Sequence, residues 1–197
     1  MPLQQILPTW LALNNCNFTS PSAITDPLTG QPYYAGGLNV GDYFDTTEQE
    51  ANSMSYLANG LLHAGRYRFV QVDSGATAAN VKTGTVGYMV NGGQPKLNLV
   101  TSYDKGIVGV HEVIYLNIIT PGNYGFVQEL GVANVLCGAT ITKAGAVTGD
   151  VLNAVANGVV DDPTSQTPVI ATLGIALDPP NPNTRVRMFM TATSVQG

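Results

Sequence analysis

Hydrophobic and polar residues alternate with a period of two along much of the chain after residue 64. The clearest example is the heptapeptide GRYRFVQ at 65–71, which returns as GNYGFVQ at 122–128. Side chains of an extended chain change sides at every residue, so each copy predicts a strand with its aromatic residues on one face. That face packs either in a core or at a subunit interface. Its aromatic residues are Tyr67, Phe69, Tyr124 and Phe126.

The same alternation, broken by turn residues, predicts further strands. Residues 88–100 favour a hairpin around an Asn-Gly turn, and residues 113–119, which are apolar on both faces, favour a central strand. Short strands are also expected within 141–148, 169–177 and 185–190. Strands this closely spaced, without a helical pattern between them, are typical of a sandwich or a small barrel.

One helix is predicted between residues 45 and 62. Thr46 or Thr47 offers an N-cap, Glu48 and Glu50 suit the first turn, and an Asn-Gly pair ends the segment. Apolar residues recur at helical spacing, which indicates one amphipathic helix packed beside the β-body. These residues are Met54, Leu57, Ala58 and Leu61.

The first forty residues contain five prolines and several glycine turns, and they predict an extended arm. The arm carries hydrophobic anchors that a disordered tail does not need. These anchors seat either in a groove of a neighbouring subunit or on the chain's own domain. They are Trp10, Leu11, Leu13 and Phe18.

The expected fold class is therefore mainly β: a small β-sandwich or barrel body with one short helix and an extended N-terminal arm. We expect the arm and the helix to occupy residues 1–62 and the β-rich body to occupy residues 63–197.

Composition bears on the surface. Charged residues are 11% of the chain, against roughly 25% in typical soluble domains. Interface cores are depleted of Lys, Glu and Asp, so the shortage favours a surface that other subunits cover. The alternative is a monomer kept in solution by its many Asn, Gln, Ser and Thr residues.

The formal net charge is −5, and the cations never cluster beyond Arg-x-Arg. A nucleic-acid partner, which needs a basic stripe, is not expected.

The sequence shows no targeting signal, and its two cysteines do not predict a metal site. Residues 1–65 contain no Lys or Arg, so the basic region of a secretory signal is missing. No apolar run approaches the roughly 20 residues that span a bilayer. We expect a soluble protein, made in a cytoplasm, with no membrane partner. Cys16 and Cys137 lack metal-ligand spacing and are expected to be free buried thiols.

Candidate catalytic chemistry is sparse. His63 and His111 are the only histidines, they lie in different segments, and no nucleophile accompanies either in a triad-like arrangement. Asp161 and Asp162 precede Pro163 and fit a solvated turn better than a catalytic carboxylate pair. The P-loop, the nucleophile elbow and the Cys-x-x-Cys motif are absent. The sequence predicts no enzymatic activity, no metal site and no cofactor.

Four pieces follow one another in the C-terminal part: PGNYGFVQ at 121–128, GATIT at 138–142 with GAV at 145–147, LGIALD at 173–178, and RVRMFM at 185–190. In this order they resemble the capsid decoration, or cement, proteins of tailed bacteriophages. The resemblance covers the chain from residue 121 onward. It implies a non-enzymatic virion protein, often a homotrimer, that is made in the host cytoplasm. Such a protein binds the major capsid protein on the outer surface of the head and stabilises its lattice.

If the resemblance holds, the aromatic residues and arginines supply the contacts with the capsid or with other subunits. Guanidinium groups pair well with carboxylates at interfaces, although the arginines fit solvated strand faces equally well. Replacing Arg66 and Arg68 together by Ala is expected to leave the fold intact and to weaken capsid occupancy. The candidate interface residues are Trp10, Leu11, Leu13, Phe18, Arg66, Tyr67, Arg68, Phe69, Tyr124, Phe126, Arg185 and Arg187.

An alternative function is a head-fibre or tail-associated binding module that contacts a host receptor. The Tyr33-Tyr34 pair and the loop at 161–168 would then supply aromatic and polar contacts. Copy number separates the two functions, because cement subunits occur in hundreds per virion and receptor-binding tips in few.

Overall fold

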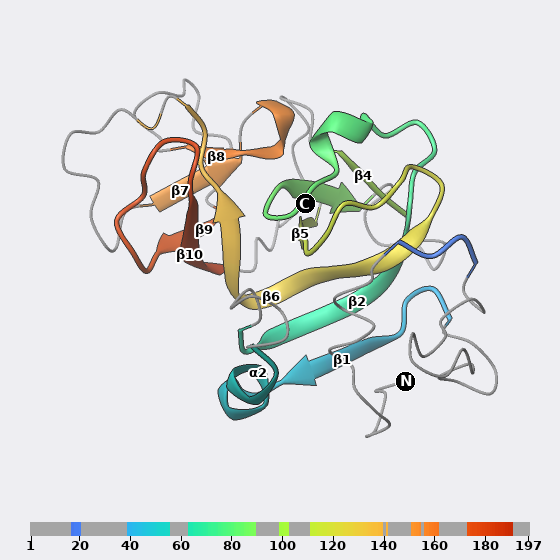
Figure 1. Cartoon of the computed structure of the whole chain (residues 1–197), viewed down its shortest axis with the longest axis horizontal. Coiled ribbons are helices and arrows are strands. Elements are labelled where there is room, and N and C mark those ends of the chain that lie inside the picture. The colour runs from blue at the N-terminus through green and yellow to red at the C-terminus, as the bar shows by residue number, and fades with distance from the viewer. Residues whose placement is uncertain are drawn as a thin grey trace, which may run out of the picture.

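The computed structural model describes residues 17–20, 39–55, 63–89, 99–102, 111–139, 141, 151–154, 156–161 and 173–190. Within these residues the fold is mainly β with one short α-helix, as expected from the sequence (Figure 1). The elements in chain order are β1 (Tyr43–Thr46), α2 (Glu48–Ser55), β2 (Gly65–Val72), η1 (Ala78–Asn80), β3 (Val86–Met89), β4 (Leu99–Ser102), β5 (Glu112–Tyr115), β6 (Tyr124–Leu136), β7 (Val151–Ala154), η2 (Ala156–Gly158), β8 (Val160–Asp161), β9 (Gly174–Ala176) and β10 (Arg185–Met190).

Five of the strands close into a small barrel. β2 pairs with β6, β6 with β5, β5 with β3 and β3 with β4, and β4 returns to β2 in a parallel pairing. The β3–β4 pair confirms the expected hairpin, whose turn lies outside the described residues. β5 lies between β3 and β6, which confirms the expected central strand.

The expected strand at 113–119 is too long. β5 ends at Tyr115, and Ile118 lies in the following loop with 67% of its surface exposed. Ile119 is buried in the barrel core although it is not part of a strand. The apolar run therefore continues past the end of β5 because a loop residue, as well as the strand, fills the core.

The two copies of the duplicated heptapeptide lie side by side as antiparallel neighbours in β2 and β6. Phe69 faces Phe126 at the centre of the pairing, and Tyr67 faces Gln128. The ring centroids of the two phenylalanines are 5.2 Å apart. Tyr67, Phe69 and Phe126 have no exposed surface, and Tyr124 packs partly buried against the same core. Of the two alternatives for the aromatic face, the structure places these residues in the core of the barrel.

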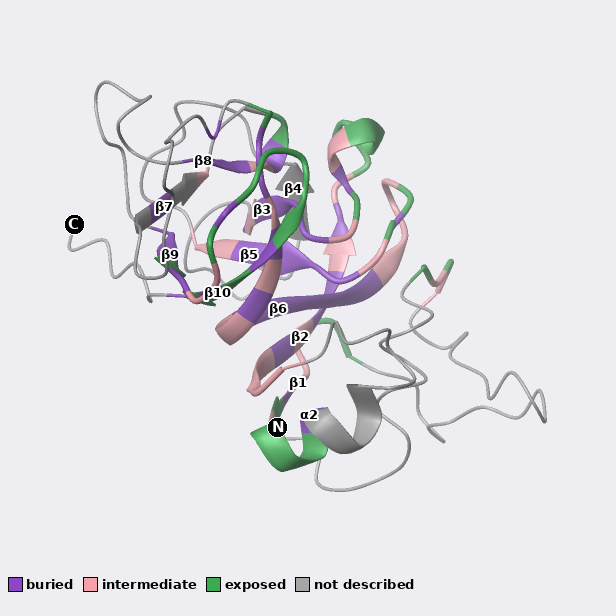
Figure 2. Cartoon of the chain, turned by 60° about the vertical axis from the view of Figure 1, so that its left-hand side comes forward, coloured by how far each residue is buried: buried purple, intermediate pink, exposed green. Residues whose placement is uncertain are grey.

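A second sheet extends from the barrel through β6. The second half of this long strand pairs with β10, and the sheet continues to β9, β7 and β8. One side of the sheet is buried: Val135, Val186 and Met188 pack with Val86 and Ile114 of the barrel strands. Figure 2 shows buried residues running along β2, β5 and β6. The hydrophobic core of the barrel and the buried side of the second sheet therefore adjoin along β6.

Parts of the expected arm and helix segment belong to the body. β1 pairs with β2, and the rings of Phe44 and Tyr67 stack with centroids 5.2 Å apart. Phe18 forms a backbone bridge with Tyr124 and packs against the barrel core. Asp45, expected to begin the helix, is in β1 instead, because it pairs with Arg66 across the β1–β2 ladder. Trp10, Leu11 and Leu13 lie outside the described residues.

Candidate interaction surface

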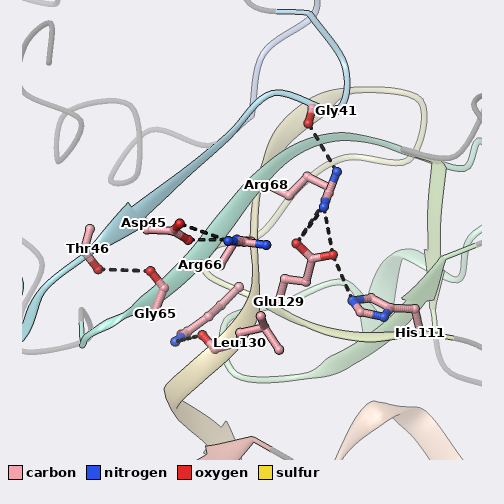
Figure 3. Close-up of polar contacts among 10 residues, drawn as sticks. Gly41, Asp45, Thr46, Gly65, Arg66, Arg68, His111, Glu129 and Leu130 are labelled. Carbon is pink, nitrogen blue, oxygen red and sulfur yellow. Dashed lines mark hydrogen bonds and ion pairs between the residues drawn. The ribbon is translucent and has the colours of Figure 1, made fainter. Parts of the chain in front are cut away.

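Arg66 of β2 uses its guanidinium within the chain (Figure 3). Its Nε donates to Asp45 Oδ1 at 2.8 Å, and its Nη2 donates to Asp45 Oδ2 at 3.0 Å. The guanidinium carbon also lies 4.5 Å from the centroid of the Tyr43 ring. The pair is bidentate, but both side chains are substantially exposed. Arg66 is therefore held in place by β1 and still borders solvent.

Glu129 of β6 is the centre of a buried polar cluster (Figure 3). Its side chain is 8% exposed; it accepts a hydrogen bond from Arg68 Nη2 at 2.9 Å and lies 2.9 Å from His111 Nε2. Burial opposes its ionisation, but the interactions with His111 and Arg68 outweigh burial and hold the pKa of Glu129 below its ordinary value. Arg68 Nη1 also donates to Gly41 O at 3.3 Å. The cluster thus ties the turn before β1 to the barrel.

This cluster changes the expectation for Arg68. A guanidinium that neutralises a buried carboxylate is part of the fold, and its removal leaves Glu129 with only His111 as a partner. Replacing Arg66 and Arg68 together is therefore not expected to leave the fold intact. The structure gives Arg66 and Arg68 intramolecular partners, and their role at an interface stays a prediction.

The outer side of β10 carries an exposed apolar row. Phe189 is 50% exposed and Ile175 of β9 is 39% exposed. Phe189 faces Ile175 across one ladder and the half-buried Val132 of β6 across the other. Because directly opposed residues have Cβ atoms about 5 Å apart, the row is continuous. Arg185 and Arg187 lie on the same side of β10. We call Val132, Ile175, Arg185, Arg187 and Phe189 the β10 face.

The two arginines of the β10 face differ in their charge environment. Arg187 Nη2 donates to Asp178 Oδ1 at 2.6 Å. Hydrogen bonding between the two side chains lowers the pKa of Asp178. Arg185 has no carboxylate partner among the residues that the structure describes. The positive charge of the face is therefore carried mainly by Arg185.

Sequence reasoning named Arg185 and Arg187 but missed Phe189 and Ile175. The alternation of RVRMFM was the available signal, because it places Phe189 on the side of the two arginines and three apolar residues on the other. Ile175 could not be found in this way, since only its register against Phe189 makes it part of the row.

Three properties of the described residues bear on their chemistry: metal ligation, membrane spanning and thiol reactivity. Among them, no three His, Cys, Asp or Glu side chains lie close enough to hold a metal ion. In the same residues no helix has the length and apolar character needed to cross a membrane. Cys137 is free and buried, as expected, and burial raises the pKa of its thiol to about 11. Cys16 lies outside the described residues. A protonated, buried thiol is inert.

The chain has a remote structural similarity to a known protein. No protein-family model and no curated protein matches the sequence. Among solved structures, the chain is similar to the crystal structure of the head fiber gp8.5 N base in bacteriophage phi29, with a TM-score of 0.44 and 13% sequence identity. The similarity covers 64% of this chain and 92% of that chain.

Proposed function

We propose that the chain is a structural subunit of a tailed-phage virion that attaches to the outside of the head and stabilises the capsid lattice as a cement subunit. One observation carries the proposal. Three of the four pieces that resemble cement proteins, at 121–128, 173–178 and 185–190, belong to strands β6, β9 and β10, which are neighbours in one sheet. The pieces at 173–178 and 185–190 pair directly as β9 and β10, and β10 pairs with residues 131–136 of β6, the strand in which the piece at 121–128 continues. The outward side of this part of the sheet is the β10 face.

The makeup of the β10 face supports this function. Aromatic residues and arginine are enriched in protein interfaces, whereas Lys, Glu and Asp are depleted there. Such a surface needs no catalytic group to act. A protein that binds only the intact lattice stabilises it by mass action. Several linked copies on equivalent capsid sites gain avidity from their high effective concentration, so that modest contacts at each site suffice.

Binding to intact heads tests the proposal. We expect the purified chain to sediment with heads that lack it, to be present in hundreds of copies per head, and to raise the temperature at which the heads disrupt. Copy number is measured by quantitative mass spectrometry, and position by electron microscopy of the particle. Disassembled capsid subunits are the control, because a cement protein discriminates in favour of the assembled lattice.

Two other results would change the assignment. A handful of copies per virion, placed at a fibre or the tail, would favour the alternative of a binding module that contacts a host receptor. If the chain bound neither heads nor tails, the proposal of a virion component would be wrong.

A further inference from the structure

The β10 face requires a partner that supplies both apolar surface and a carboxylate. Phe189 and Ile175 face each other and remain partly exposed. Arg187 is already paired with Asp178, while Arg185 has no carboxylate partner in the described part of the chain. A partner that covered only the apolar row would leave the Arg185 charge unmatched next to a desolvated surface, which is unfavourable.

The turn before β1 has the complementary makeup. Val40 is 36% exposed, which makes it one of the four exposed large hydrophobic residues among those described. Two residues later, Asp42 accepts a hydrogen bond from Asn39 N at 2.9 Å. No cationic partner of Asp42 is present among the described residues. We call Asn39, Val40, Gly41 and Asp42 the acidic turn.

The other exposed hydrophobic residue outside the β10 face lacks this combination. Ile118 lies in the loop at 117–120, which contains no acidic residue. In contrast, residues 39–55 contain four acidic residues and no Lys or Arg. Among the described residues, therefore, an exposed apolar side chain and an acid without a cationic partner occur close together at the acidic turn.

We propose that the β10 face of one copy binds the acidic turn of a second copy, so that Arg185 pairs with Asp42 and Val40 covers the apolar row. The inference rests on the proposed function, because it supplies the link between copies from which avidity on the capsid lattice arises. The long arginine side chain allows one short turn to reach both features. Charge also favours this partner, because the chain has a formal net charge of −5 and the β10 face is locally positive.

The contact is heterologous, meaning that two different surfaces meet. The acidic turn leads into β1 at one end of the molecule, and β10 lies at the opposite end in Figure 1. One copy therefore cannot satisfy its own β10 face. Heterologous contacts join copies head to tail, and they close into a ring where the rotation between copies allows it. A ring of three would be the homotrimer that the resemblance to cement proteins implies.

A charge swap tests the pairing in the full chain. We compare the wild type with Arg185→Asp, Asp42→Arg and the double variant by sedimentation velocity over a range of concentrations. Each single variant is expected to raise the dissociation constant of self-association by about tenfold, and the double variant to restore it, as expected for a direct charge pair. Circular dichroism checks that each variant is folded.

An apolar pair of variants tests the second half of the contact. Phe189→Ser is expected to weaken self-association at least as much as Arg185→Asp. Ile118→Ser removes a still more exposed hydrophobic residue outside both surfaces and is expected to have no effect on self-association. The inference is wrong if the double charge variant is not restored, if the Ile118 variant matches the Phe189 variant, or if the wild type is monomeric at every concentration.

Sedimentation with heads, run in parallel, separates this inference from the proposed function. A wild-type chain that is monomeric but binds heads overturns the self-contact and leaves the virion function standing. A wild-type chain that self-associates with the expected charge-swap behaviour but does not bind heads supports the self-contact and overturns the proposed cement function.

Discussion

Arg66 and Arg68 are two residues apart on the same side of β2, yet they have different surroundings. Arg66 is 33% exposed and pairs with Asp45, whose side chain is 58% exposed. Arg68 is 23% exposed and pairs with Glu129, whose side chain is 8% exposed. A solvent-exposed ion pair contributes little to stability because water screens its charges. A buried carboxylate, in contrast, destabilises the fold when its partner is removed. Sequence spacing makes the two arginines look equivalent, and only burial separates them.

Matched alanine variants test this difference at the residue scale. Arg68→Ala is expected to lower the free energy of unfolding by about 3 kcal/mol, since it leaves a buried carboxylate short of its cation. Arg66→Ala is expected to cost about 0 to 1 kcal/mol, as for other exposed pairs. Urea unfolding measures both values. An Arg66 variant that loses as much stability as the Arg68 variant would contradict this account.

At the scale of elements, α2 shows how a short helix is fixed locally. Eight residues are too few for a stable helix in water, so the helix needs its cap and the contacts of its buried Ala51. Thr47 Oγ1 accepts a hydrogen bond from Glu50 N at 3.2 Å, and Glu50 Oε2 accepts one from Thr47 N at 2.8 Å. Of the two capping residues expected from the sequence, Thr47 is therefore the cap. Thr46 is in β1, and its hydroxyl donates to His63 O.

Removing the cap gives a prediction for the helix. Thr47→Ala is expected to destabilise the protein by about 1 kcal/mol, because the Glu50 backbone N–H loses its acceptor, the Thr47 hydroxyl. Thr47→Ser keeps the hydroxyl and is expected to stay close to the wild type. Urea unfolding, together with hydrogen exchange of the α2 amides, measures the effect. Equal losses in the two variants would show that the methyl group, not the cap, matters.

At the scale of the whole molecule, two groups in different parts of the fold make stability depend on pH in the same direction. Burial lowers the pKa of His63 below its ordinary 6.5, and the pKa of Glu129 lies below its ordinary 4.5. In each case the unfolded chain takes up a proton at a higher pH than the folded chain does. Acid therefore favours unfolding through both groups.

Titration of stability tests this coupling. The free energy of unfolding is expected to fall first as pH drops below about 6.5, the ordinary pKa of His63, and again below about 4.5, the ordinary pKa of Glu129. Glu129→Gln should be less stable near neutral pH and should show a smaller second fall, while the first fall remains. Urea unfolding over a pH series measures both steps. An unchanged second fall in the variant would exclude Glu129 as its source.

Features that depend on neighbouring residues along the chain could be predicted from the sequence. Strand β10 begins and ends where the alternation of RVRMFM predicted, and Thr47 caps the helix as one of two candidates. Periodicity, turn residues and caps are local properties, so a single segment is enough to reveal them.

The pairing of segments that lie far apart in the chain is seen only in the folded structure. The duplicated heptapeptide was visible in the sequence, but its two copies pair with each other through contacts between residues more than fifty positions apart. A similar separation in sequence hides the partnership of Arg68 with Glu129. A shorter separation still hides that of Phe189 with Ile175 across the β9–β10 ladder. A local pattern shows which residues of a strand share a face, but which strand lies opposite depends on how distant segments pack together.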